Sequence, residues 1–258
     1  MGKPLPEVIF VPPYLQNLGY AELPEMRELA VRAQTITDKV ILGDPLWFRW
    51  RGILDYVCCV EYARQNIKAL PSGSALGSVD QVPARYHSIS LVFFAQATLD
   101  NIAVWICDRL NISLTGSDRS FHKAKLKAKL LSYAPSLAAV TIKHAAYFAK
   151  LDNYRKHWIH FLTGGAAFYS DKNPGLPNVR IGVMIPINPA VFLYTDQAAF
   201  SKAVERTRTN NGGEWLYPIA DFADEFAGGL KDFLIEFLGA MLRERKVDSS
   251  DSGGSHAG

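Results

Sequence analysis

The chain has 258 residues, of which 48% are hydrophobic and 21% are charged. This composition is typical of a globular protein with one large core, and it excludes disordered and membrane-embedded classes. The net charge of +3 permits a polyanionic partner without requiring one. Three cysteines, Cys58, Cys59 and Cys107, are too few and too badly placed for a disulfide framework. We therefore expect a reduced, cytoplasmic protein with no signal peptide and no membrane partner.

Prolines and helical spacing organise the first part of the chain. Residues 1–20 contain four prolines, which break helices and central strands, so we expect an extended surface arm there. Residues 22–41 are predicted to form a helix, with Pro24 in the first turn and Gly43 just beyond the end. A longer helix is predicted from Pro45 to about Leu70, because apolar residues recur every three or four positions.

The middle of the chain predicts a loop and three more helices. Serines and glycines crowd between Pro71 and Pro83, which is typical of a loop. A third long helix is predicted from about Arg85 to Leu110, and a shorter one over Lys123–Leu131. A fifth is predicted from about Ser136 to His160, before a Gly-Gly pair that suits a helix C-terminus.

The sequence changes character after the fifth helix. Residues 180–187 and 191–195 are short runs rich in β-branched or aromatic residues, and they predict a β-hairpin over about residues 179–195. An Asn-Asn-Gly-Gly sequence at residues 210–213 predicts a turn or loop.

The last predicted helix runs from Pro218 to about residue 245. Its apolar residues trace one continuous stripe, made of Ile219, Phe222, Phe226, Leu230, Phe233, Phe237 and Met241. The Ser-, Gly- and Asp-rich tail at residues 248–258 is expected to be disordered. Without repeats or a strong boundary, residues 1–247 predict one mainly α domain: an antiparallel helical bundle of about five to six helices with a small β-hairpin insertion.

Several familiar kinds of site are missing from the sequence. No glycine-rich loop followed by Lys-Ser or Lys-Thr is present to cradle a triphosphate. The serines at Gly73–Gly77 do not have the spacing of a nucleophile elbow, so this segment is interpreted as a flexible linker. His157 and His160 stand three apart, but no pattern supplies further ligands. We therefore expect no metal and no cofactor.

Four alternating lysines form the densest positive charge in the chain: Lys123, Lys125, Lys127 and Lys129. On a helix, Lys123 and Lys127 share one face, and the other two lie nearly opposite. The favoured interpretation is a solvated helix whose lysine stems cover apolar neighbours. The alternative is that one of the two rows contributes to RNA binding.

Residues 151–161 concentrate titratable groups at the end of the fifth predicted helix: Asp152, Arg155, Lys156, His157 and His160. In an α-helix, Arg155 and His160 would flank one broad side rather than stack. Asp152 stands one turn before Arg155 and Lys156, where it can pair with either cation. His160 lies near the helix C-terminus, where the helix dipole favours its protonated form.

Phosphoryl transfer is the chemistry that such a pair can perform. A histidine with a pKa near neutral can move a proton at a ribose 2′-hydroxyl or at the leaving 5′-oxygen. An arginine can bind the phosphate and stabilise the charge that develops on it. No metal is needed if the nucleophile is the 2′-hydroxyl, which restricts the substrate to RNA.

Arg155 and His160 are separated by four residues at the end of the fifth predicted helix. This Arg-x4-His pattern on the last helix of a core bundle resembles the signature of the HEPN superfamily. The polar-studded segment Phe94–Ala103 also resembles the helix that packs against the motif helix in several HEPN groups. The resemblance covers about residues 45–162, and the hairpin and C-terminal helix look like an extension. It implies that Arg155 binds phosphate and that His160 transfers protons.

The resemblance further implies a metal-independent endoribonuclease that leaves 2′,3′-cyclic phosphate ends. Such enzymes are commonly homodimers with two Arg/His pairs facing each other, and many belong to toxin–antitoxin, antiphage or CRISPR-linked systems. The implied partners are RNA, a second copy of the chain with the motif helix at the interface, and a cognate antitoxin or regulatory protein. The implied localisation is cytoplasmic.

Two polar residues on the third predicted helix, Asp100 and Asn101, need partners if they are buried. They either orient Arg155 or His160, or satisfy each other and the backbone.

Two alternatives to an enzyme stay open. One is a catalytically inactive HEPN-like module that binds nucleic acid, a nucleotide or a protein. The other is a structural helical protein in which the arginine merely bridges Asp152.

Overall fold

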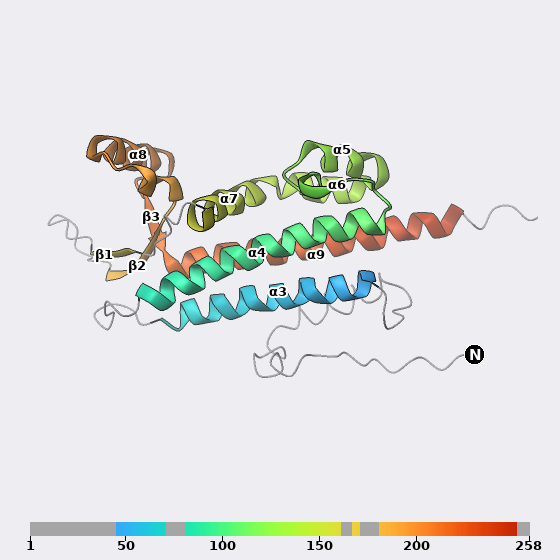
Figure 1. The fold of residues 1–258 in the computed structure, drawn as a ribbon, viewed down its shortest axis with the longest axis horizontal. Coiled ribbons are helices and arrows are strands. Elements are labelled where there is room, and N and C mark those ends of the chain that lie inside the picture. Colours follow the sequence, from blue (N-terminus) through green and yellow to red (C-terminus); the bar gives the residue numbers. More distant parts are fainter. Residues whose placement is uncertain (1–44, 71–80, 161–166, 171–180, 252–258) are drawn as a thin grey trace, which may run out of the picture.

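The computed structural model describes residues 45–70, 81–160, 167–170 and 181–251 (Figure 1). The predicted N-terminal arm, the helix predicted over residues 22–41 and the Gly73–Gly77 linker lie outside these residues. Within them the chain is mainly α-helical, as predicted.

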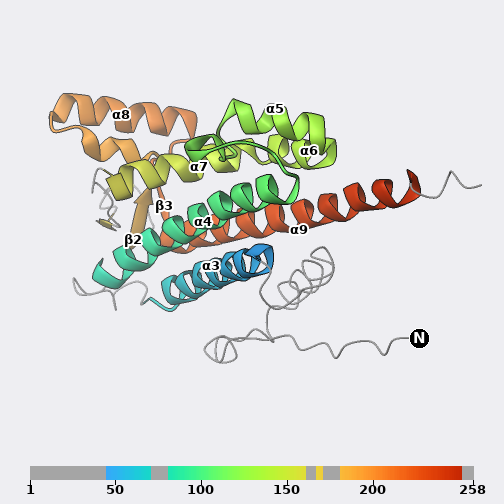
Figure 2. The same ribbon diagram turned by 45° about the vertical axis from the view of Figure 1, so that its right-hand side comes forward.

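Three long helices run side by side and carry most of the core (Figures 1 and 2). They are α3 (Pro45–Lys68), α4 (Gln81–Arg109) and α9 (Ile219–Asp251). Helix α4 packs against both α3 and α9. All seven apolar residues of the stripe predicted for the last helix are buried, so that prediction is confirmed. The helix continues to Asp251, past the point where we expected a disordered tail to begin.

Helix α4 is apolar along most of its length. By length and composition alone, its segment Val82–Arg109 could cross a membrane, although we expected no membrane partner. More than half of its most apolar window is buried inside the protein. The core helix of a soluble protein has the same properties, so this segment is weak evidence for a membrane span.

Along the chain, three shorter α-helices and a π-helical turn lie between α4 and the first strand of the sheet. They are α5 (Ala124–Tyr133), α6 (Pro135–Lys143), α7 (Ala145–Arg155) and the π-helix Lys156–His160. The single helix predicted from Ser136 to His160 is therefore wrong. His144 has φ −91° and ψ 8°, outside the α-helical region, and this residue separates α6 from α7.

The predicted β-hairpin is only half right. The strand β2 (Ile181–Pro186) exists, but its neighbours are β1 (Ala167–Ser170) and β3 (Leu216–Pro218), in the antiparallel order β1-β2-β3. Residues 191–195 do not form a strand, because Pro189–Leu193 is a 3₁₀-helix. The Asn188 side chain accepts a hydrogen bond from the Ala190 N–H at 3.1 Å and caps this helix.

Helix α8 (Gln197–Asn210) was not anticipated from the sequence. The Asp196 carboxylate accepts a hydrogen bond from the Ala199 N–H at 2.6 Å and caps its first turn. The turn predicted at residues 210–213 follows directly, and both of its glycines have positive φ, +64° at Gly212 and +96° at Gly213.

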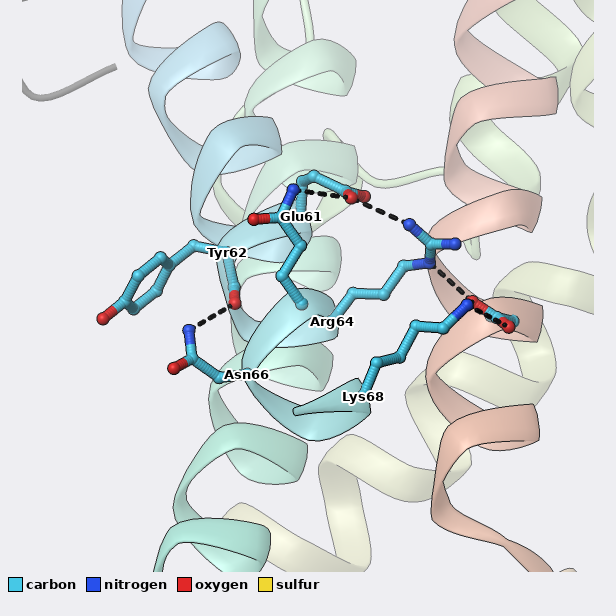
Figure 3. A network of polar contacts seen from close by, with 7 residues as sticks. Glu61, Tyr62, Arg64, Asn66 and Lys68 are labelled. Atoms are coloured by element: carbon cyan, nitrogen blue, oxygen red, sulfur yellow. Dashed lines mark hydrogen bonds and ion pairs between the residues drawn. The ribbon is translucent and has the colours of Figure 1, made fainter. Parts of the chain in front are cut away.

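Ion pairs and hydrogen bonds join neighbouring elements of the fold. Arg64 Nε on α3 lies 2.6 Å from Asp224 Oδ1 on α9. Figure 3 shows the Arg64 side chain extending from α3 toward the neighbouring helix. Lys68 reaches the same carboxylate at 3.1 Å. The buried Tyr154 hydroxyl on α7 lies 2.6 Å from the Pro186 carbonyl at the end of β2. The helix that carries the Arg-x4-His motif is thereby fixed to the sheet.

Candidate functional site

Asp152 pairs with the two cations that follow it, Arg155 at the end of α7 and Lys156 in the π-helical turn. Arg155 donates to Asp152 Oδ1 from Nε at 3.2 Å and from Nη2 at 2.8 Å. Lys156 Nζ lies 2.7 Å from Asp152 Oδ2. The spacings of three and four residues predict these contacts, and here one carboxylate makes both. Although burial alone would raise the pKa of Asp152, hydrogen bonds from Lys156 and Arg155 hold it below its usual value.

The turn after Arg155 is π-helical, which changes the relation between the two motif residues. Hydrogen bonds in a π-helix join residues five apart, so position 160 lies one turn beyond position 155. From the sequence we expected a regular α-helix in which the two residues flank one broad side rather than stack, and the π-helical turn contradicts that expectation. The structure describes the backbone of His160 but not its side chain. Single π-turns inside helices occur frequently at functional sites.

His122 belongs to this group, and sequence reasoning missed it. It lies in the turn before α5, and the charges of Asp152 and Arg155 both affect its pKa. Burial dominates, so the pKa of His122 is lowered and the neutral imidazole is favoured at pH 7. Its Nε2 atom is buried without a hydrogen-bond partner among the described residues. No local motif marks His122. Tertiary packing brings it here, since the ring of the preceding residue, Phe121, stacks on Phe148 of α7 at 5.4 Å.

The two polar residues predicted on α4 have different environments. Asp100 accepts a hydrogen bond from Gln96 Nε2 at 2.9 Å. Burial raises its pKa, and the charge of Arg155 acts in the opposite direction. Asn101 instead donates to the Ala97 carbonyl of its own helix at 2.8 Å. Asp100 therefore lies in the electrostatic environment of Arg155, whereas Asn101 satisfies the backbone.

His157 is engaged with its own helix. Its Nδ1 atom lies 2.7 Å from the Asn153 carbonyl, which can only accept, so the ring nitrogen donates. Among the described residues, no group of three or more His, Cys, Asp or Glu side chains is arranged to hold a metal ion. The donor chemistry of the cluster thus consists of cations, carboxylates and a neutral imidazole.

The arrangement places two solvent-accessible cations at the end of α7. Arg155 and Lys156 share the carboxylate of Asp152, and Asp100 lies in the electrostatic environment of Arg155. The Lys156 side chain is 55% exposed and that of Arg155 is 31% exposed, so both cations are open to solvent. No family model, curated protein or solved structure matches the chain.

Proposed function

We propose that the chain is a metal-independent endoribonuclease of HEPN type. Arg155 binds the scissile phosphate and stabilises its developing charge, and His160 transfers protons. The observation that carries the proposal is the placement of Arg155. It is held by Asp152 at the start of a π-helical turn, one turn before position 160. A fixed, solvent-accessible guanidinium suits a phosphate, because its planar donors match two phosphate oxygens.

The reaction uses only the substrate's own nucleophile. The ribose 2′-oxygen attacks the adjacent phosphorus as its proton is removed, and the bond from phosphorus to the 5′-oxygen breaks. The leaving 5′-oxygen takes up a proton, so the products are a 2′,3′-cyclic phosphate and a 5′-hydroxyl. In a homodimer, two Arg155/His160 pairs face each other, and one histidine accepts a proton while the other donates one.

The fold supports the same proposal at a coarser level. Helices α3, α4 and α9 together with α6 and α7 would form the antiparallel bundle, and β1–β3 with α8 would be the addition beside the motif. The protein would act in the cytoplasm, in toxin–antitoxin or antiphage defence, with a cognate antitoxin or regulatory protein as partner.

The proposal is tested by incubating the purified protein with a structured RNA in excess EDTA. We expect cleavage by the wild type and loss of about 10²-fold or more in rate for Arg155→Ala and for His160→Ala. His87→Ala is the matched control, because this α4 histidine contacts the rings of Tyr62 and Tyr86 and belongs to no part of the proposed site. Equal rates for all four proteins would refute the proposal.

A second candidate is a HEPN-like module that binds RNA without cleaving it. The ion pair between Arg155 and Asp152 favours it, because a structural arginine would make the same contacts. Tight RNA binding that survives His160→Ala, with no cleavage by the wild type, would favour this candidate.

A further inference from the structure

Helix α8 is joined to the end of the motif helix by a chain of contacts. The Tyr154 hydroxyl of α7 donates to the Ile187 carbonyl at 2.9 Å, and the Ile187 N–H donates to the Trp215 carbonyl at 2.9 Å. The Trp215 ring packs edge-on against Phe200 of α8, with the ring centres 6.1 Å apart. Since Arg155 is the next residue after Tyr154, these contacts hold α8 beside the end of α7, on the side away from α3 (Figures 1 and 2).

Most of α8 faces solvent and carries positive charge. Of its 14 residues, all of which the structure describes, only Thr207 is buried. Lys202, Arg206 and Arg208 are exposed, and none of them forms an ion pair with a residue in the described ranges. Glu205 is the single acidic residue of the helix, so three cations and one anion leave a net charge of +2, against +3 for the whole chain.

Lys202 and Arg206 gather on one face of this helix. Residues four apart in an α-helix are neighbours on its surface, and like charges at this spacing repel and destabilise the helix. The fold therefore gains nothing from this pair of cations. Arg208 is different, because it lies about 160° around the helix from Arg206. It also stands in the last turn, where the helix dipole favours a positive charge.

We propose that Lys202 and Arg206 bind the phosphate backbone of single-stranded RNA that extends from Arg155 along α8. Exposed cations without an internal partner are complementary to a chain of phosphates, and their position beside the end of α7 favours the strand whose scissile phosphate Arg155 binds. We call Lys202 and Arg206 the α8 surface. The inference rests on the proposed function and names the part of the protein that holds its substrate away from the scissile phosphate.

The test is the affinity of a labelled 2′-O-methyl RNA oligonucleotide, measured over a range of salt concentrations. The blocked 2′-oxygen prevents cleavage, so binding is measured alone. Lys202→Ala and Arg206→Ala should each weaken binding and reduce the slope of log K against log salt by about 0.7, the value for one phosphate contact on a single strand. Lys202→Arg should behave like the wild type, because it keeps the charge. Both alanine variants should unfold at the wild-type temperature, because each removes one of two charges that repel each other.

Arg208→Ala is the matched control, because it removes a charge from the other flank of the same helix. It should leave the slope unchanged, and so should Lys143→Ala, at a side chain that is 64% exposed and pairs with Glu236 of α9. Equal losses for Arg206→Ala and Arg208→Ala, no loss for Lys202→Ala and Arg206→Ala, or no binding of RNA by the wild type would overturn the inference. The last result would leave an acidic protein as the partner of α8.

Cleavage of unmodified RNA separates this inference from the proposed function. Cleavage combined with either of the first two results would refute the α8 surface and retain the nuclease. A selective loss of binding for Lys202→Ala and Arg206→Ala, without cleavage by the wild type, would do the reverse.

Discussion

Asp152 is the residue on which the proposed site depends most directly. Its side chain is only 14% exposed, yet it meets two cations through separate oxygens. A carboxylate in this position fixes the arginine before any substrate binds, so little conformational entropy is lost when phosphate binds. The spacing in the sequence predicted these partners, because helical geometry alone sets contacts three and four residues apart.

Asp152→Asn should change how stability depends on pH. The folded-state pKa of Asp152 is lowered, so its ionised form stabilises the protein above the unfolded pKa of about 3.9, and this contribution disappears as pH falls through the folded value. We expect the variant to be less stable than the wild type at pH 7 and the difference to shrink toward pH 2. Urea unfolding at both pH values measures this, and a difference that does not depend on pH would contradict it.

Two adjacent glycines on α9 should respond differently to substitution by alanine. A Cβ atom at Gly229 would lie 2.7 Å from two atoms of the Tyr147 ring, whereas one at Gly228 would meet nothing within 4 Å. The ring cannot easily move, since the Tyr147 hydroxyl donates to the Phe226 carbonyl at 2.9 Å. Gly229→Ala should destabilise the protein by about 1–3 kcal/mol.

Gly228→Ala is the matched control and should be neutral or stabilising by up to about 1 kcal/mol, because alanine favours the helix. Thermal unfolding of both variants makes the comparison. A Gly229→Ala variant as stable as the wild type would show that α7 and α9 do not approach each other as closely as described.

At the scale of elements, Tyr154 links the motif helix to the sheet. Its ring is fully buried against Phe222 and Trp158, and its hydroxyl reaches the carbonyls of Pro186 and Ile187. Tyr154 directly precedes Arg155 in the sequence. The position of the π-helical turn relative to β2 therefore depends on this side chain.

Tyr154→Phe should keep the ring packing and lose only the hydrogen bond. Because the hydroxyl is buried, we expect a destabilisation of about 1–3 kcal/mol, together with faster amide exchange in β2. Tyr133→Phe, at a side chain that is 55% exposed, is the control and should change neither. Unchanged exchange in β2 would mean that the hydroxyl does not anchor α7 to the sheet.

The elements also show which features a sequence can predict. The apolar spacing predicted α3, α4 and α9, because each buries a continuous face, and that periodicity is local information. The π-helical turn and the pairing of β2 with β1 and β3 depend on tertiary contacts and were not predicted. The same division applies to the site: the partners of Asp152 were predicted, but His122 was not.

At the scale of the whole molecule, the acidic side chains of α9 hold the surrounding helices. Asp224 pairs with α3, Glu225 with Lys150 of α7, and Glu236 with Lys143 of α6. These exposed pairs are each worth only about 0.2–1 kcal/mol, so the apolar core supplies most of the stability. They neutralise basic side chains on α3, α6 and α7.

The proposed composite site requires two copies of the chain. We expect the protein to sediment as a dimer under the conditions in which it cleaves RNA, with the end of α7 protected from amide exchange by the partner. A monomeric mass at those concentrations, measured by analytical ultracentrifugation, would contradict a site made of two facing Arg155/His160 pairs.

In the proposed mechanism, Arg155 and His160 cleave RNA without a metal, by attack of the substrate's own 2′-hydroxyl. The most direct measurement is the chemical nature of the ends that the purified wild type leaves on an RNA in excess EDTA, beside the His160→Ala variant. We predict 2′,3′-cyclic phosphate and 5′-hydroxyl ends from the wild type alone. Intact RNA from both proteins, or 5′-phosphate ends from either, would contradict the mechanism.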